Sequence, residues 1–167
     1  MQTADKIARR VVGLRLLFGG IWAIDAVMKW LPGFRKGFVV DIMGAAQDQP
    51  HWLGWWFNFW MNPLMSHHTF FAYLTAVVET LIALALLFGF VRKPAYILGA
   101  VFSLLIWGIG EGFGGPYTNG STDIGAAVMY AVVFYALYLL EQAAPDSWSV
   151  DRLLEKKIAW WKAVSRP

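Results

Sequence analysis

The sequence predicts an all-α membrane protein: a four-helix transmembrane bundle with an amphipathic, tryptophan-rich interfacial helix between the first and second spans. Hydrophobic residues make up 58% of the 167-residue chain and charged residues only 15%, whereas a soluble domain is about 45–50% apolar even with glycine counted. A spanning helix needs about 20 mostly apolar residues. The chain therefore has room for four spans and their connections, and we expect a single membrane domain over residues 1–167.

Four apolar stretches give the positions of the spans. The first follows a basic N-terminal segment, and it is too long and too charged to be a cleaved signal peptide. Pro94 and the glycine-rich segment EGFGGPYTNGSTD break the chain between the later stretches. The predicted spans are residues 11–31, 71–90, 95–110 and 124–140.

The distribution of positive charge predicts the orientation. Lysine and arginine are concentrated in the N-terminal segment, at Arg92 and Lys93, and in the C-terminal tail, whereas the connection before the fourth span has none. Basic segments stay in the cytoplasm, so we expect a multi-pass protein with both termini cytoplasmic. Lysines and apolar residues alternate faces over residues 146–164, which predicts an amphipathic helix on the inner membrane surface.

The long first connection contains a stripe of aromatic residues within residues 51–61. These residues fall at i, i+3, i+4, i+7 and i+8, so one helical face carries Trp52, Trp55, Trp56, Phe59 and Trp60. Indole side chains favour the headgroup layer. We therefore predict a helix on the outer interface, serving as an anchor or a lid over the bundle, and the alternative is that its rings stack on a quinone.

Ionisable side chains within the spans indicate the candidate site. Such residues cost ~2.5–3.5 kcal/mol each on insertion scales and usually face the bundle interior. At about 1.5 Å per residue, Asp25 in the first span and Glu79 in the second lie at nearly one depth in the outer half. Four carboxyls there, Asp25, Glu79, Glu111 and Asp123, share one ammonium, Lys29. We therefore expect Glu79 to carry a proton at neutral pH, and we assign proton handling to Glu79 and Asp25 as the candidate catalytic residues.

A simpler interpretation of these charges stays open. Asp25 and Lys29 would form a local i,i+4 pair, Glu111 and Asp123 would be interfacial, and Glu79 alone would be buried and bonded to a tyrosine. If a cofactor binds at this site, we expect it to contact aromatic and carboxyl groups close to the glycine-rich turn, which holds Tyr117 over the carboxyl cluster. The candidate cofactor-binding residues are Trp22, Trp107, Glu111, Tyr117, Asp123 and Tyr130.

The run IGEGFGGPYTNGSTDIGAAVMY, with four spans, a charged first helix and an acidic residue in the second, resembles the DoxX/DoxD-like membrane family. That family includes the membrane subunit of thiosulfate:quinone oxidoreductase. The resemblance covers most of residues 5–142 and is most distinctive over residues 108–130.

The resemblance implies a quinone-linked subunit of a respiratory or sulfur-oxidising assembly in a prokaryotic plasma membrane. Quinone would be its cofactor, and membrane lipid and other subunits would be its partners. The alternative function is a non-catalytic membrane scaffold or anchor subunit that docks a redox partner.

Several other classes are disfavoured. The chain has no cysteine, which excludes disulfides, thiolate zinc sites and iron–sulfur ligation. His51, His67 and His68 lie outside the predicted spans, so we expect no intramembrane haem, and charges at the span ends argue against nucleic acid as a partner. Met61 and Met65 with His67 and His68 could bind Cu(I), but methionines packed beneath the tryptophans are the simpler interpretation, and we predict no metal site.

Overall fold

The computed structural model describes residues 2–115, 123–144 and 148–167, and every regular element in these ranges is a helix. The all-helical class is therefore confirmed for the described residues. The α-helices are α1 (Gln2–Trp30), α2 (Pro32–Ala46), α3 (Gly54–Ser66), α4 (His68–Phe88), α5 (Arg92–Leu105), α6 (Ala127–Ala143), α7 (Val150–Glu155) and α8 (Trp161–Ser165). The short helix η1 (His51–Leu53) precedes α3, and the π-helix η2 (Ile106–Gly110) and the 3-10 helix η3 (Gly112–Gly114) follow α5.

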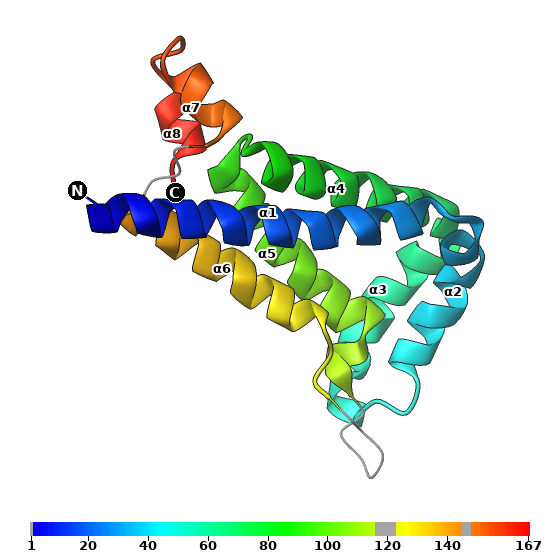
Figure 1. Ribbon diagram of the computed structural model, residues 1–167. Coiled ribbons are helices and arrows are strands. Elements are labelled where there is room, and N and C mark those ends of the chain that lie inside the picture. The colour runs from blue at the N-terminus through cyan, green and yellow to red at the C-terminus, as the bar shows by residue number, and fades with distance from the viewer. Residues whose placement is uncertain (1, 116–122, 145–147) are drawn as a thin grey trace.

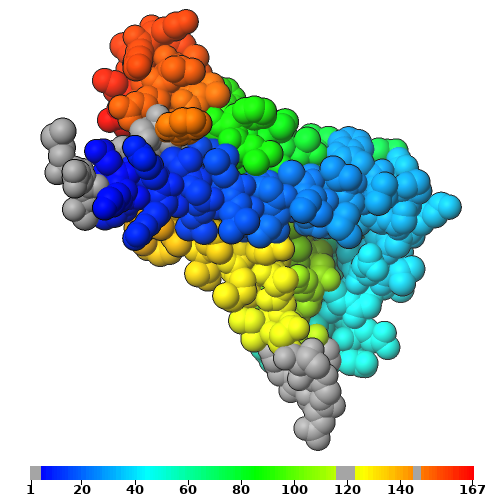
Figure 2. Space-filling model, in the orientation of Figure 1, coloured from blue at the N-terminus to red at the C-terminus, as the bar shows by residue number. Residues whose placement is uncertain are grey.

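Among the described residues, three helical segments are long and apolar enough to cross a membrane: Asp5–Trp30 in α1, His68–Phe88 as α4, and Arg92–Gly110 across α5 and η2. The helix α6 is apolar as well and has 17 residues. In Figure 2, α1 lies across the face of the molecule, and several of its large apolar side chains are on the surface. These lengths and exposed apolar faces are those of a membrane protein.

The long helices pack as two pairs. Helix α1 runs beside α4, and α5 packs against α6 (Figure 1). Trp22, Leu86, Tyr96 and Phe134 belong to the main core cluster, to which α1, α4, α5 and α6 all contribute. Gly99 sets the α5–α6 contact, because a Cβ atom at this position would lie 2.4 Å from the Phe134 ring.

Helices α2 and α3 occupy the first long connection, beside one end of α4 (Figure 1). The predictions above place no helix over Pro32–Ala46, where charged residues and glycines interrupt the apolar pattern. A second core cluster joins Phe38 and Ile42 of α2 to Leu64 of α3 and Ala72 of α4. This cluster fixes α2 and α3 against the bundle.

The segment predicted as the tryptophan-rich helix is divided between η1 and α3. Its five aromatic residues differ in their surroundings. Trp52, Trp55 and Phe59 are exposed, whereas Trp56 and Trp60 are half-buried.

The tail predicted as one helix over residues 146–164 instead forms two short helices in its described part, α7 and α8. The reason is that its carboxylates bind the turn between α4 and α5. Asp151 accepts hydrogen bonds from the backbone N–H groups of Val91 (2.8 Å) and Arg92 (2.9 Å) and caps the start of α5. The buried Arg92 guanidinium in turn contacts Asp151 (3.1 Å), Glu141 (2.9 Å) and Glu155 (3.7 Å).

Candidate functional site

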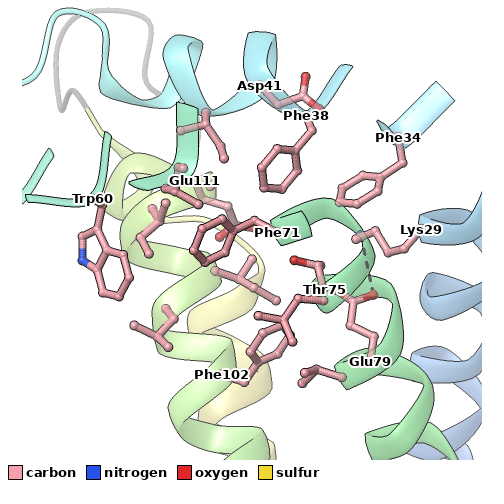
Figure 3. Close-up of a pocket in the computed structure, with 18 residues that line it drawn as sticks. Lys29, Phe34, Phe38, Asp41, Trp60, Phe71, Thr75, Glu79, Phe102 and Glu111 are labelled. Atoms are coloured by element: carbon pink, nitrogen blue, oxygen red, sulfur yellow. Dashed lines mark ion pairs between the residues drawn. The ribbon is translucent and has the colours of Figure 1, made fainter. Parts of the chain in front are cut away.

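A pocket of about 510 Å³ lies between α2, α3, α4 and the α5–η2 segment (Figure 3). Its wall is largely apolar, and each of these helices contributes at least one aromatic ring. The rings belong to Phe34 and Phe38 of α2, Trp60 of α3, Phe71 of α4 and Phe102 of α5. This volume and lining are those of a site for a small, mostly apolar molecule, since such sites measure roughly 300–1,000 Å³.

The repeating positions of the wall follow from helical spacing. On α4, Phe71, Thr75, Val78 and Glu79 stand at i, i+4, i+7 and i+8 and share one face. On the α5–η2 segment the spacing is i, i+3, i+4 and i+7, from Phe102 to Ile109. Each helix therefore presents a continuous stripe to the pocket.

Ionisable groups interrupt the apolar wall at three places. Lys29 and Glu79 lie together on one side of the pocket, and Glu111 lies across from them (Figure 3). Asp41 of α2 also lines the pocket and is otherwise exposed. A ligand in the pocket would thus contact aromatic rings along its length and charged groups at its ends.

Glu79 is the most unusual of these residues. Its side chain is 0% exposed, and neither carboxyl oxygen has a hydrogen-bond partner among the described residues. The nearest cation, the Nζ of Lys29, lies 3.8 Å from Oε2. A buried carboxyl without a donor is costly, so Glu79 does not stabilise the fold through hydrogen bonds to the described residues and is the leading candidate for a functional group in this pocket.

Lys29 is shared between two carboxyls. Its Nζ donates to Oδ1 of Asp25 at 2.9 Å, the i,i+4 pair on α1, while Glu79 on α4 is farther away. The same ammonium lies 5.1 Å from the centre of the Phe34 ring, a cation–π contact. The packing of α1 on α4 brings Asp25, Lys29 and Glu79 together, at the shared depth that span lengths predict. The tyrosine partner considered for Glu79 is not found among the described residues.

Glu111 lines the pocket but has other partners. Its carboxyl oxygens accept the backbone N–H of Ala127 at 3.0 and 3.3 Å and so cap the start of α6. Asp123 bonds the N–H of Gly125 at 2.7 Å in a local turn and is exposed. The glycine-rich connection therefore delivers one carboxyl to the pocket and uses the other to shape its own backbone.

The described aromatic candidates are divided between two places. Trp22 and Tyr130 pack together in the core, with ring centres 5.8 Å apart. Trp107 donates to the carbonyl oxygen of Ile124 at 2.6 Å and lines a second groove. Tyr117 lies outside the described residues.

The second groove, of about 640 Å³, runs between the η1–α3 segment and α5. It is lined by several indoles, among them Trp52, Trp55 and Trp56. The N–H of Trp56 donates to the carbonyl oxygen of Gly108 at 3.0 Å. The indole N–H groups of Trp56 and Trp107 in this groove are thus bonded to backbone carbonyl oxygens. This makes the groove a weaker candidate for a binding site than the Glu79 pocket.

The residues considered for copper are placed differently from one another. Met61 and Met65 are half-buried and pack against the second core cluster, whereas His67 and His68 are exposed. His68 Nδ1 lies 3.2 Å from the carbonyl oxygen of Met65. The methionines therefore serve as packing residues.

Comparison of this chain with protein families, with curated proteins and with solved structures finds no match. The pocket and its ionisable groups are therefore the evidence from which a function follows.

Proposed function

We propose that this chain is a quinone-linked membrane subunit of a redox assembly and that the Glu79 pocket holds the quinone ring. One observation carries the proposal: a fully buried carboxyl, to which none of the described residues donates a hydrogen bond, lies in the wall of an aromatic pocket. A quinone is a flat apolar ring with oxygen atoms at its edge. It matches a pocket that offers ring contacts along its wall and ionisable groups at its ends.

The roles of the residues follow from their positions. Phe71 and Phe102 would contact the ring faces, and Lys29 with Glu79 would hold one edge. A bound quinone supplies two-electron redox chemistry coupled to proton transfer. Glu79 would exchange a proton with a ring oxygen, because it lies in the pocket wall and its oxygens accept no hydrogen bond from the part of the chain that the structure describes.

The membrane arrangement that we propose has four spans, with α6 as the fourth. Its 17 residues reach the lower end of the lengths that cross a bilayer, about 17–25 residues. Both termini would be cytoplasmic, in a prokaryotic plasma membrane, and the exposed Trp52, Trp55 and Phe59 would lie at the outer interface. This arrangement agrees with the resemblance to DoxX/DoxD-like proteins.

The scaffold alternative needs buried charges that await a partner's helices. The buried Arg92 is paired with Glu141, and Asp25 is paired with Lys29. Among the described residues, no group donates a hydrogen bond to Glu79, which lies 3.8 Å from Lys29 and lines a pocket. These pairings favour the quinone proposal.

The test is direct binding of a short-chain quinone to the purified protein in nanodiscs. Thr75→Phe would place a ring in the pocket and should weaken binding at least about tenfold, which corresponds to about 1.4 kcal/mol. Val77→Phe is the matched control, because Val77 is exposed on the same helix. This variant should bind the quinone as tightly as the wild type does. Absence of saturable binding, or equal binding by both variants, would contradict the proposal.

A further inference from the structure

Three ionisable side chains join the Glu79 pocket to the surface of α1. The side-chain exposure rises along the series, from 0% for Glu79 to 21% for Lys29 and 30% for Asp25. Lys29 lines the pocket, and Asp25 lies beside Lys29 on the preceding turn of the same helix. The ammonium of Lys29 therefore connects a buried carboxyl in the pocket wall to a half-buried one on the outward face of α1.

The other charged and titratable groups around Glu79 are less suited to this connection. Across the pocket, Glu111 is occupied with the N–H of Ala127, and Asp41 lies on α2 at the pocket rim. On α6, the Tyr130 ring is packed against Trp22. Lys29 is the charged group in ion-pair contact with Glu79 among the described residues.

We infer that Lys29 relays protons between Glu79 and Asp25, so that the protons of the pocket carboxyl pass to and from Asp25 on the outward face of α1. This inference rests on the proposed function, in which Glu79 handles the protons of a pocket ligand. The Lys29 ammonium gives one proton to the Asp25 carboxylate, and the resulting amine takes one proton from the Glu79 carboxyl. The net result is one proton moved from Glu79 to Asp25, with Lys29 again an ammonium and the total charge unchanged.

Lysine suits this role because of two properties of its side chain. Its flexible four-carbon stem lets Nζ move from 2.9 Å contact with Asp25 into hydrogen-bond contact with Glu79, which now lies 3.8 Å away. Its amine can also lose a proton, whereas an arginine guanidinium stays charged. Arginine at this position would keep the charge and remove the relay.

The experiment follows Glu79 itself and needs no quinone. Time-resolved infrared spectroscopy after a pH jump records its carboxyl band, identified as the band that Glu79→Gln lacks. Lys29→Arg and Lys29→Met should both slow the response of this band by about a hundredfold, the lower end of what a positioned proton-transfer group contributes. Lys36→Arg, an exposed change on α2, is the control and should respond as the wild type does.

The outcome for Lys29→Arg decides the inference. Wild-type kinetics in this variant would overturn it, since Lys29 would then only pair with charge. Short-chain quinone binding is measured on the same samples. If the wild type bound no quinone, the proposed function would be overturned. The infrared rates of the Lys29 variants would still show whether Lys29 relays protons.

Discussion

The buried and half-buried carboxyls of this protein differ in what they bind. Glu141 accepts a hydrogen bond from Arg92 at 2.9 Å and another from the hydroxyl of Tyr96. Glu111 caps α6, whereas Glu79 binds no donor among the described residues. Replacing a carboxylate with its amide should therefore have opposite consequences at Glu79 and Glu141.

Glu79→Gln should change the free energy of unfolding by less than about 1 kcal/mol, because no hydrogen bond is lost. Glu141→Gln should cost about 3 kcal/mol or more, because it leaves the buried guanidinium of Arg92 short of a partner. Denaturant unfolding in detergent measures both. Quinone-linked turnover in the intact assembly should fall only slightly in Glu141→Gln once the fold is intact, and strongly in Glu79→Gln, whose amide cannot cycle a proton. A strongly destabilised Glu79→Gln protein would contradict this account.

Glu155 gives a pH dependence outside the membrane-spanning helices. Hydrogen bonds from Arg166 (2.5 and 3.0 Å), followed by one from Ser165 (2.7 Å), hold the pKa of Glu155 below its ordinary value. A lowered pKa means that ionised Glu155 stabilises the fold fully above the ordinary value, and that this contribution is lost as the pH falls through the lowered one. The unfolding temperature should therefore fall more steeply below about pH 4.5 in the wild type than in Glu155→Gln. Parallel curves would show that Glu155 contributes nothing.

Hydropathy and depth located part of the candidate site in advance. Glu79, Asp25 and Lys29 could be assigned to one level because helix rise fixes depth along each span. The rings of Phe34 and Phe38 could not be assigned to the pocket, because no helix is predicted over Pro32–Ala46. In addition, the periodicity of a helix shows its apolar face but not which other helix packs against that face. The i, i+4, i+7, i+8 spacing on α4 could have identified Phe71, Thr75 and Val78 as pocket residues, because they share a helical face with Glu79.

The contact between α5 and α6 depends on the missing side chain of Gly99. A methyl group there would meet the Phe134 ring at 2.4 Å, well inside van der Waals contact. Phe134 is fully buried, so its ring has little space in which to move away. The packing of these two helices should therefore be sensitive to a single added carbon.

Gly99→Ala should lower the free energy of unfolding by about 1–3 kcal/mol through overpacking. The matched control is Gly13→Ala on α1, where a Cβ atom would have nothing within 4 Å. That change should be neutral or should stabilise by up to about 1 kcal/mol, because alanine favours a helix over glycine. Equal effects of the two substitutions would contradict the packing argument.

Elements were predicted with uneven success for identifiable reasons. The long apolar helices follow from composition, because a membrane span needs an unbroken apolar stretch. The prediction of a single helix over the tail was wrong. The alternation of lysines and apolar residues does not reveal that Asp151 and Glu155 bind Arg92, which is far away in the sequence. Partners far apart in the sequence decide whether such a segment lies on a membrane or folds back on the bundle.

The first helix and the C-terminal segment lie close together in the bundle, which bears on the proposed topology. The N-terminus of α1 and the α7–α8 segment lie at the same end (Figure 1), and Arg15 of α1 donates to the carbonyl oxygen of Trp148 at 2.7 Å. The basic residues of the tail and of the α4–α5 turn are at this end too. This proximity agrees with the proposed arrangement, in which both ends of the chain lie on one side of the membrane.

A reporter fused after Pro167 should be cytoplasmic, and one inserted near Asn119 should be external. The physical reason is the excess of lysine and arginine at the end where α1 begins and the absence of either in the connection that contains Asn119. Paired alkaline phosphatase and fluorescent protein fusions measure both positions. An external reporter after Pro167 would contradict the four-span arrangement.

The capping of α5 by Asp151 also has a consequence for the order of folding during synthesis. The turn between α4 and α5 is synthesised about sixty residues before its capping residue, since Asp151 accepts hydrogen bonds from Val91 and Arg92. Until Asp151 leaves the ribosome, two amide groups and one guanidinium at this corner lack that acceptor. Insertion of the apolar helices and closure of the corner are thus separate events, and a nascent chain arrested before Asp151 should be inserted in the bilayer yet open to protease at the α4–α5 turn.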